Sequence, residues 1–357
     1  MQLCKRRLFN IFATPSNTFC SFNSEPHTFQ IVLTGGPCGG KSTALTKVSE
    51  RLTSLGYRAF VVPELPTLFN QCGAGFIPNM SKTELLTYEA SIIKAQISLE
   101  NSFNLIAKVS QKPSVILCDR GTMDVSAYLA TEDWKLLLDM EGWNVVNLRD
   151  HRYDAVFHLV TAAIGAEKFY TLNNNIARRE TLEEARQLDF RTREAWLGHP
   201  LMRIITNEKD FNHKVTKLID GIMGVIGLPK PKHHERRWFV PEEIGQKLWD
   251  SLDFWKKLNY QEFDVVSHYL VSEKPTENAL QQPRITKRSQ NDENSYSYSV
   301  RYEEPGDLSM INISAQRIST RNYLQLLSRV DSKRDPVSKK VCPFFIIYLI
   351  FIYRKFS

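Results

Sequence analysis

Short apolar runs alternate with longer amphipathic stretches over roughly the first two thirds of the chain. Residues 29–33 predict a buried strand, and residues 42–55 place apolar side chains at every third or fourth position, which is the spacing of a helix. The same patterns predict strands at 57–63, 114–118, 153–160 and 201–206 and helices at 81–110, 173–196 and 211–226. Alternating strands and helices predict an α/β domain in which helices flank a parallel sheet and ligands bind at the carboxyl ends of the strands.

Beyond residue 230 the pattern changes to a period of two, which is the spacing of strands with two unlike faces. Strands are predicted at 263–271, 284–288, 296–301 and 310–316, followed by a helix at 320–330. A run of strands after an alternating α/β part indicates a second domain of α+β type.

The chain of 357 residues is long enough for about two domains, each with its own core. Its formal net charge of +7 is uneven, because residues 284–357 hold 13 Lys and Arg against 7 Asp and Glu. This basic excess favours an anionic partner there, such as phosphate groups or an acidic membrane surface, although a generic solvated surface has the same composition. We expect no nucleic-acid partner.

Residues 1–28 carry Lys5, Arg6 and Arg7 and a single acid, Glu25. This composition fits a mitochondrial transit peptide as well as a disordered leader, and we favour the leader because the basic residues are few and clustered. The six cysteines are scattered and form no C-x-x-C pair. We therefore expect a reducing compartment with no disulfide or zinc site, and a cytoplasmic protein that can lie at the periphery of membranes.

One glycine-rich segment defines the chemistry expected of the first domain. Residues 34–43 read Thr-Gly-Gly-Pro-Cys-Gly-Gly-Lys-Ser-Thr and fit the pattern G-x-x-x-x-G-K-[ST] between a predicted strand and a predicted helix. The alternative is a glycine-rich turn that binds nothing. We disfavour it because the motif and the strand and helix patterns on either side of it agree independently. Backbone N–H groups at such a helix start face phosphates, Lys41 adds positive charge, and the Ser42 hydroxyl can hold Mg²⁺. The residues predicted to bind ATP or GTP are Gly35, Gly36, Pro37, Cys38, Gly39, Gly40, Lys41, Ser42 and Thr43.

Charged residues follow the predicted strands at the same end of the sheet. Asp119 closes the strand at 114–118, where P-loop proteins keep the acid that orders Mg²⁺ or its waters; the alternative is a helix N-cap. Arg120 is placed to reach a phosphate. Glu64, after the strand at 57–63, can accept a proton from a substrate hydroxyl as a general base, or it is an ordinary loop carboxylate.

Arg178 and Arg179 precede a predicted helix after the fourth strand, in the position of a lid. Such arginines would clamp a transferred phosphoryl group and stabilise its charge, whereas the alternative pairs them only with acids on an exposed helix. We favour the lid. Residues 207–210, Asn-Glu-Lys-Asp, do not form the N-K-x-D guanine signature, so the sequence leaves ATP and GTP open.

Four segments share the order and spacing of a known family: 33–42, 62–66, 118–121 and 177–180. On these residues the chain resembles the TRPL translocation defect protein 14 family, from Phe29 to about Lys340. Residues 29–229 are similar to the P-loop domain of bacterial ribosylnicotinamide kinases. The resemblance implies binding of ATP or GTP, binding of phosphoinositides or other anionic lipids, and a role in membrane-protein trafficking.

The resemblance also implies that residues 230–340 form a degenerate CYTH-like domain, related to an eight-stranded antiparallel tunnel that binds triphosphates or other polyanions. The opening E-x-E-x-K strand of such domains is matched only in part, since His233 replaces its first acid. Fewer carboxylates disfavour a metal-dependent hydrolase, because hard divalent cations prefer carboxylate oxygens. The candidate polyanion contacts are Glu235, Arg237, Arg284, Arg288, Arg301 and Arg317, which are otherwise solvated outer-face side chains.

After Lys340 the family continues with strands that close the tunnel, whereas residues 341–357 of this chain contain an apolar run. That run is shorter than the roughly 20 residues that a membrane-spanning helix needs. We expect an anomalous apolar tail, from a truncated isoform or a read-through into non-coding sequence. The alternative is an anchor that dips into a membrane.

Two functions therefore remain from the sequence. The first is a nucleotide-binding protein that also binds phosphoinositides or other polyanions and acts in membrane-protein trafficking. The second is a P-loop kinase whose small-molecule phosphoryl acceptor resembles a nucleoside. Triphosphate hydrolysis by the second domain is not expected.

Overall fold

The fold was examined in a computed structural model of the chain. The structure describes residues 28–110, 112–170, 181–228, 261–271, 280–303, 311–346 and 349–356, and the statements below concern these residues. Several predictions lie outside them, namely those for the leader, Arg178, Arg179, Glu235 and Arg237.

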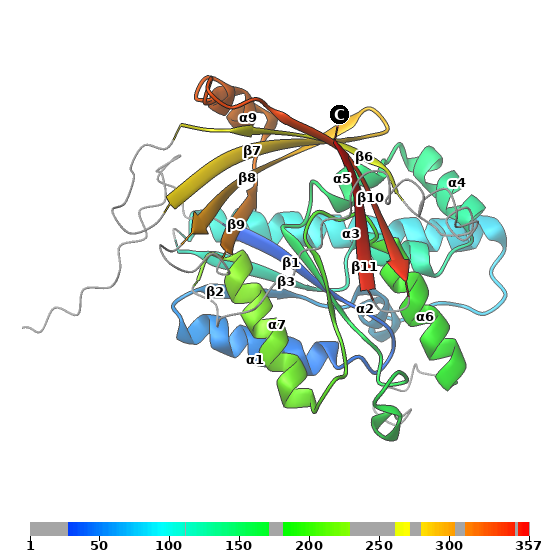
Figure 1. Cartoon of the computed structure of the whole chain (residues 1–357). Coiled ribbons are helices and arrows are strands. Elements are labelled where there is room, and N and C mark those ends of the chain that lie inside the picture. The colour runs from blue at the N-terminus through cyan, green and yellow to red at the C-terminus, as the bar shows by residue number, and fades with distance from the viewer. Residues whose placement is uncertain are drawn as a thin grey trace, which may run out of the picture.

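The first domain is a five-stranded parallel sheet with the strand order β2-β3-β1-β4-β5. Each strand lies within two residues of its predicted position, since parallel strands buried on both faces give continuous apolar runs. The predicted parallel sheet flanked by helices is confirmed (Figure 1). The strands are β1 (Thr28–Thr34), β2 (Arg58–Val62), β3 (Ser114–Asp119), β4 (Ala155–Leu159) and β5 (Met202–Ile205).

Different helices cover the two faces of this sheet (Figure 1). Ile31 and Leu33 of β1 pack with α1 (Lys41–Ser54) and α7 (Phe211–Val225), whereas Val32 packs on the opposite side with α3. These three side chains are fully buried. The central strand therefore holds the P-loop segment that follows it on a rigid base.

Helix α3 (Lys82–Val109) begins where the capping signal predicts. The Ser81 hydroxyl accepts a hydrogen bond from the backbone N–H of Glu84, whose carboxylate in turn accepts one from the Ser81 N–H at 2.8 Å. The short helices between strands were not predicted, because most span too few turns for a helical period to stand out. They are α2 (Leu65–Gln71), η1 (Thr122–Ala127), α4 (Thr131–Glu141), α5 (Val145–Arg149) and η2 (Glu167–Phe169). Helix α6 (Leu182–Ala195) completes the domain.

The second domain is a six-stranded antiparallel sheet with the order β11-β10-β6-β7-β8-β9. Its four predicted strands and its helix are present, and α9 (Thr320–Leu327) packs Tyr323 and Leu326 against Leu270 and Ile285. The strands are β6 (Phe263–Tyr269), β7 (Leu280–Gln290), β8 (Glu293–Glu303), β9 (Ile311–Arg317), β10 (Val337–Ile346) and β11 (Leu349–Phe356).

No strand was predicted in the segment 341–357, and its interpretation as an anomalous tail stays a prediction. Most of it lies in β10 and β11, which pair from Lys339 opposite Phe356 to Ile346 opposite Leu349. The physical reason is composition, because β-branched and aromatic residues favour strands. Among the helices that the structure describes, none is both long and apolar enough to cross a membrane.

The second sheet lies against the first domain (Figure 1), and polar side-chain contacts join the two. The guanidinium of Arg149 donates to Gln261 at 2.6 Å and to Gln290 at 2.9 Å. Arg288 of β7 lies 3.5 Å from the Asp150 carboxylate. These three contacts reach across the domain boundary, so the second sheet is seated on the α5 end of the first domain.

Candidate functional site

The loop between β1 and α1 needs glycine at two positions because of its backbone. Gly35 (φ 133°) and Gly40 (φ 83°) adopt positive φ angles that L side chains rarely take. A Cβ atom on Gly35 would lie 2.1 Å from the carbonyl oxygen of Leu159, and one on Gly40 would lie 2.3 Å from the Phe211 ring. The loop is thus pressed against the end of β4 and the start of α7, and it leads directly into the N-terminus of α1.

Lys41 lies over this loop. Its ammonium group donates hydrogen bonds to the carbonyl oxygens of Gly35 at 2.9 Å and Gly36 at 3.0 Å. Burial and the nearby Arg120 cation lower the pKa of Lys41 to about 8, although Asp119 acts in the opposite direction. The fold therefore holds a positive charge where an anion bound at the helix start would lie.

Ser42, in the first turn of α1, meets Asp119 at the end of β3. The Ser42 hydroxyl donates to Oδ2 of Asp119 at 3.1 Å. The other carboxylate oxygen, Oδ1, is buried and has no hydrogen-bond partner in the described part of the chain. Burial raises the pKa of Asp119, and the charge of Lys41 opposes this effect. A hydroxyl and a carboxylate with a spare oxygen fit Mg²⁺, which keeps several waters and binds few protein ligands.

Glu64 and Arg120 form an ion pair at the ends of β2 and β3. Arg120 Nε lies 2.5 Å from Glu64 Oε1, and Arg120 has a positive φ of 74° that is uncommon for a residue with a side chain. Burial raises the pKa of Glu64, but the charges of Arg120 and Lys41 outweigh it and lower the pKa to about 2. Glu64 is therefore ionised at neutral pH.

Asp124 of η1 holds this arrangement in place and was not among the predicted site residues. Its carboxylate accepts hydrogen bonds from Gly121 N at 2.8 Å, from Trp196 Nε1 at 3.2 Å and from the Thr34 hydroxyl. It also lies 3.5 Å from the Arg120 guanidinium. Asp124 thereby ties the end of β1 and the α6 side of the domain to the strained Arg120.

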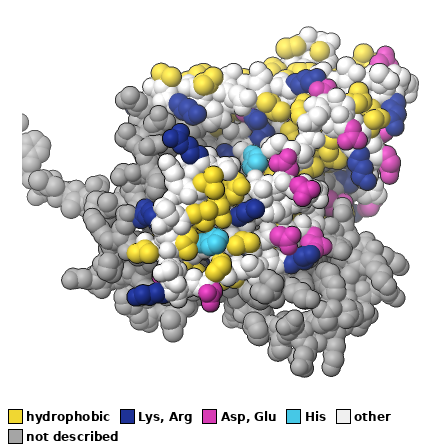
Figure 2. Space-filling view, turned by 90° about the horizontal axis from the view of Figure 1, so that it is seen from above, with side chains coloured by type: hydrophobic (Ala, Val, Ile, Leu, Met, Phe, Trp, Pro, Cys, Tyr) yellow, Lys and Arg dark blue, Asp and Glu magenta, His cyan; other side chains and the backbone are white. Residues whose placement is uncertain are grey.

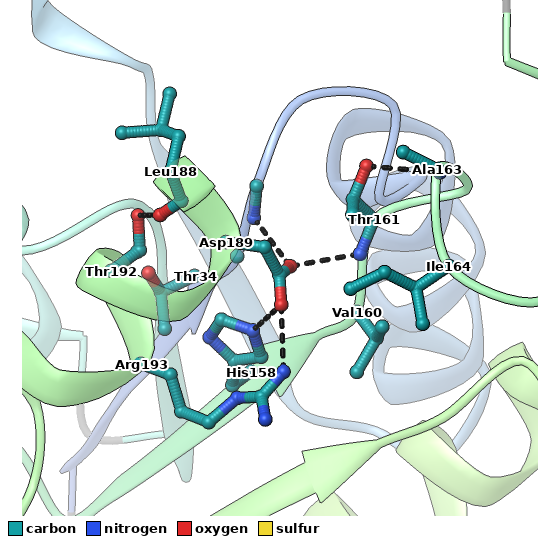
Figure 3. A network of polar contacts seen from close by, with 12 residues as sticks. Thr34, His158, Val160, Thr161, Ala163, Ile164, Leu188, Asp189, Thr192 and Arg193 are labelled. Atoms are coloured by element: carbon teal, nitrogen blue, oxygen red, sulfur yellow. Dashed lines mark hydrogen bonds and ion pairs between the residues drawn. The ribbon is translucent and has the colours of Figure 1, made fainter. Parts of the chain in front are cut away.

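A second buried acid, Asp189 of α6, binds the P-loop itself (Figure 3). Its Oδ1 accepts from the backbone N–H of Gly36 at 3.1 Å and of Thr161 at 2.8 Å. Its Oδ2 lies 2.7 Å from Arg193 and 3.1 Å from His158. Burial raises the pKa of Asp189, but its neighbours His158 and Arg193 hold that pKa well below its usual range. Helix α6 is thus attached to the loop through an ionised carboxylate.

The structure brings five predicted site residues into one place: Lys41, Ser42, Glu64, Asp119 and Arg120. Three of the predicted polyanion contacts, Arg284, Arg288 and Arg317, lie elsewhere, at a cavity of about 310 Å³ between the two domains. There Arg284 donates to the Ser299 hydroxyl at 3.0 Å, Arg288 pairs with Asp150, and Arg317 lies 3.6 Å from Asp154. Arg301 belongs to β8, and its side chain is outside the described part of the structure.

The strand order, the glycine loop, Lys41 and the Ser42–Asp119 contact together define a P-loop nucleotide-binding protein. The profile of the AAA domain family matches residues 30–214, which is just over half of the 357-residue chain. The chain belongs to this family. No curated protein matches the chain at a significant level.

Proposed function

We propose that this protein binds ATP or GTP together with Mg²⁺ at the P-loop. The observation that carries the proposal is the Ser42–Asp119 hydrogen bond, which leaves Asp119 Oδ1 unpaired beside the Lys41 ammonium. Backbone N–H groups at the end of the loop and in the first turn of α1 would bind the phosphates. Lys41 would move from its loop carbonyls to the β- and γ-phosphates. Ser42 and Asp119 would hold the magnesium ion, which would neutralise phosphate charge.

A thermal-shift experiment on the full chain tests this proposal. ATP and GTP are each added with Mg²⁺ and again with EDTA, because a ligand that binds only the folded state raises the unfolding temperature. We expect stabilisation by at least one nucleotide, a larger shift with Mg²⁺, and no shift in Lys41→Ala. Unchanged unfolding with both nucleotides would reject the proposal.

A second candidate function, phosphoryl transfer to a small molecule, is favoured by the Glu64–Arg120 ion pair. In the reaction, the bond from the bridging oxygen to the γ-phosphorus breaks and a bond to the acceptor hydroxyl oxygen forms. The nucleoside diphosphate leaves, and the hydroxyl proton passes to Glu64 and then to solvent. With a pKa of about 2, Glu64 is a weak base, so it would first orient the hydroxyl and would accept its proton only late in the reaction. This order suits a loose transition state, in which the bond to the acceptor oxygen forms late.

The same candidate gives Arg120 and the lid arginines a role. Arg120 would contact the transferred phosphoryl group from the acceptor side. Arg178 and Arg179 precede α6 in the sequence, and Asp189 attaches α6 to the P-loop. The position of this helix therefore supports a role for the two arginines in clamping the phosphoryl group. Turnover that depends on an added nucleoside and is lost in Glu64→Gln would distinguish a kinase from a binding protein.

Polyanion binding is a third proposal, and the cavity between the domains supports it. Its lining includes four cations, Arg284, Arg288, Arg317 and Lys339, against two carboxylates. On the outer face seen in Figure 2, Lys and Arg side chains are interspersed with apolar and acidic ones instead of forming one patch. Inorganic triphosphate and vesicles containing phosphatidylinositol bisphosphate are the two probes that separate a free anion from a lipid headgroup. A trafficking role rests on the family resemblance.

A further inference from the structure

Helix α3 carries a largely buried acid, Glu89, on the face that packs against the first domain. The Glu89 side chain is 9% exposed, and no hydrogen bond or ion pair joins it to another residue in the described ranges. Burial raises the pKa of Glu89 to about 7. Its carboxylate oxygens are not among the fully enclosed polar atoms without a partner, so they reach solvent at the end of an otherwise buried side chain. Burial of most of this acid without a paired charge costs stability, so the fold alone does not explain its position.

Glu100, on the same buried face of α3, is the contrasting case. Its carboxylate accepts hydrogen bonds from Gln96 at 2.7 Å, from Tyr153 at 2.8 Å and from Arg152 at 2.6 Å. Glu100 thus supports the fold through a complete set of donors. Glu89 stands three turns earlier without any of them.

Contacts of α3 with the sheet locate Glu89. Near the C-terminal end of α3, Asn104 donates to Gln30 at the start of β1, and further back Gln96 contacts the carbonyl oxygen of Arg120 after the end of β3. The helix therefore runs antiparallel to the strands. Glu89 precedes Gln96 by two turns, so it shares a face with Gln96 and lies about 10 Å further along the axis. This places Glu89 beyond the carboxyl ends of the strands, on the side of the Glu64–Arg120 pair.

We propose that Glu89 lies at the far end of the acceptor site and accepts a hydrogen bond from an exocyclic amino group of the acceptor molecule. The inference rests on the proposed kinase function, in which Glu64 and Arg120 hold the reacting hydroxyl. An acceptor would then carry a hydroxyl at one end and an N–H donor at the other, separated by about two helical turns. A nucleoside with an amino-bearing base has this form.

The test compares nucleosides that differ at the exocyclic group proposed to face Glu89 and, with it, at the hydrogen on the neighbouring ring nitrogen. Cytidine and adenosine present an exocyclic amine, whereas uridine and inosine present a carbonyl oxygen in its place. The full chain is assayed for ATP- and GTP-dependent phosphorylation of each, with kcat/KM as the readout. We expect the wild type to prefer at least one amine-bearing member over its partner by about tenfold or more. Glu89→Gln, whose amide can also donate, should reduce that preference to about threefold or less.

Glu84→Gln is the matched control. It makes the same change on the same helix at an exposed capping position, where Gln also serves, and should keep the wild-type preference. A thermal shift with nucleotide and Mg²⁺ is recorded for every variant. If the wild type shows no such shift, nucleotide binding itself fails. If the shift is present but no nucleoside is phosphorylated, or Glu89→Gln keeps the preference, the assignment of Glu89 is overturned.

Discussion

The Ser42 hydroxyl donates a 3.1 Å hydrogen bond to Asp119, which joins the first turn of α1 to the end of β3. β1 and β3 are neighbours in the sheet, and Leu33 lies opposite Asp119 in their register. The motif residue and the strand-end acid are therefore positioned by the same pair of strands. Two ligands of the kind that Mg²⁺ accepts meet beside the Lys41 charge.

Asp119→Asn should weaken nucleotide binding in the presence of Mg²⁺ and leave binding without Mg²⁺ almost unchanged. The amide keeps the shape of the side chain but loses the negative charge, so we expect Mg²⁺-dependent nucleotide affinity to fall by about 10- to 100-fold, as for loss of a charged hydrogen-bonding partner. Affinity measured in EDTA should change little. Calorimetric titration with and without Mg²⁺ checks this, and an equal loss in both conditions would contradict a metal role.

Nucleotide affinity should fall as the pH rises through about 8. The pKa of Lys41 lies near 8 in the protein, so the ammonium that would pair with phosphate is progressively lost above that value. The neighbouring Lys47 is exposed and serves as a control for general charge effects. Titrations between about pH 7 and 9.5 should show the same decline in the wild type and in Lys47→Ala. A flat profile for the wild type would count against the role of Lys41.

Glu89→Gln should stabilise the fold at high pH. The pKa of Glu89 is raised from 4.5 to about 7, so the folded state binds this proton more tightly than the unfolded state does. Its carboxylate therefore costs stability progressively as the pH rises from about 4.5 to 7, and the full cost persists above 7. The gain in unfolding free energy from the substitution should be about 3 kcal/mol at pH 8 and near zero at pH 4. Denaturant unfolding at both values measures it, and Glu84→Gln should show no such rise.

Asp189→Asn should weaken both the fold and the nucleotide site. The change leaves Arg193 buried without its carboxylate partner, which typically costs about 3–5 kcal/mol of unfolding free energy. It also replaces the charged acceptor of the Gly36 N–H by a neutral amide, which weakens the attachment of the P-loop to α6, so nucleotide affinity should fall. Glu184→Gln, an exposed capping position on the same helix, is the control. Wild-type affinity in a folded Asp189→Asn protein would show that α6 does not position the loop.

Local signals explain which parts of the site the sequence could predict. Gly35, Lys41 and Ser42 belong to one contiguous motif, and Asp119 follows a continuous apolar strand, so their positions could be inferred from neighbours in the chain. Asp124 and Asp189 could not, because the contacts that attach them to the P-loop strand and loop, with Thr34 and with Gly36, join residues far apart in the sequence. One signal was present for α3: Glu89, like Glu100, interrupts the apolar face of a helix whose period was otherwise clear.

In the second domain, too, local patterns predicted the elements, whereas contacts between distant segments could not be predicted. Alternation predicted the strands from 263 to 316, but strand order depends on pairings between distant segments. The apolar run after Lys340 was interpreted through its length and its departure from a family pattern. Its high content of Ile, Phe and Tyr would have supported a strand assignment on propensity alone.

Calorimetric titration of the full chain with ATP and with GTP, in Mg²⁺, tests the central claim most directly. The account predicts saturable binding of at least one nucleotide at one site per chain, abolished in Lys41→Ala and stripped of its Mg²⁺ dependence in Asp119→Asn. Absence of binding by both nucleotides, or binding that both variants retain unchanged, would contradict it.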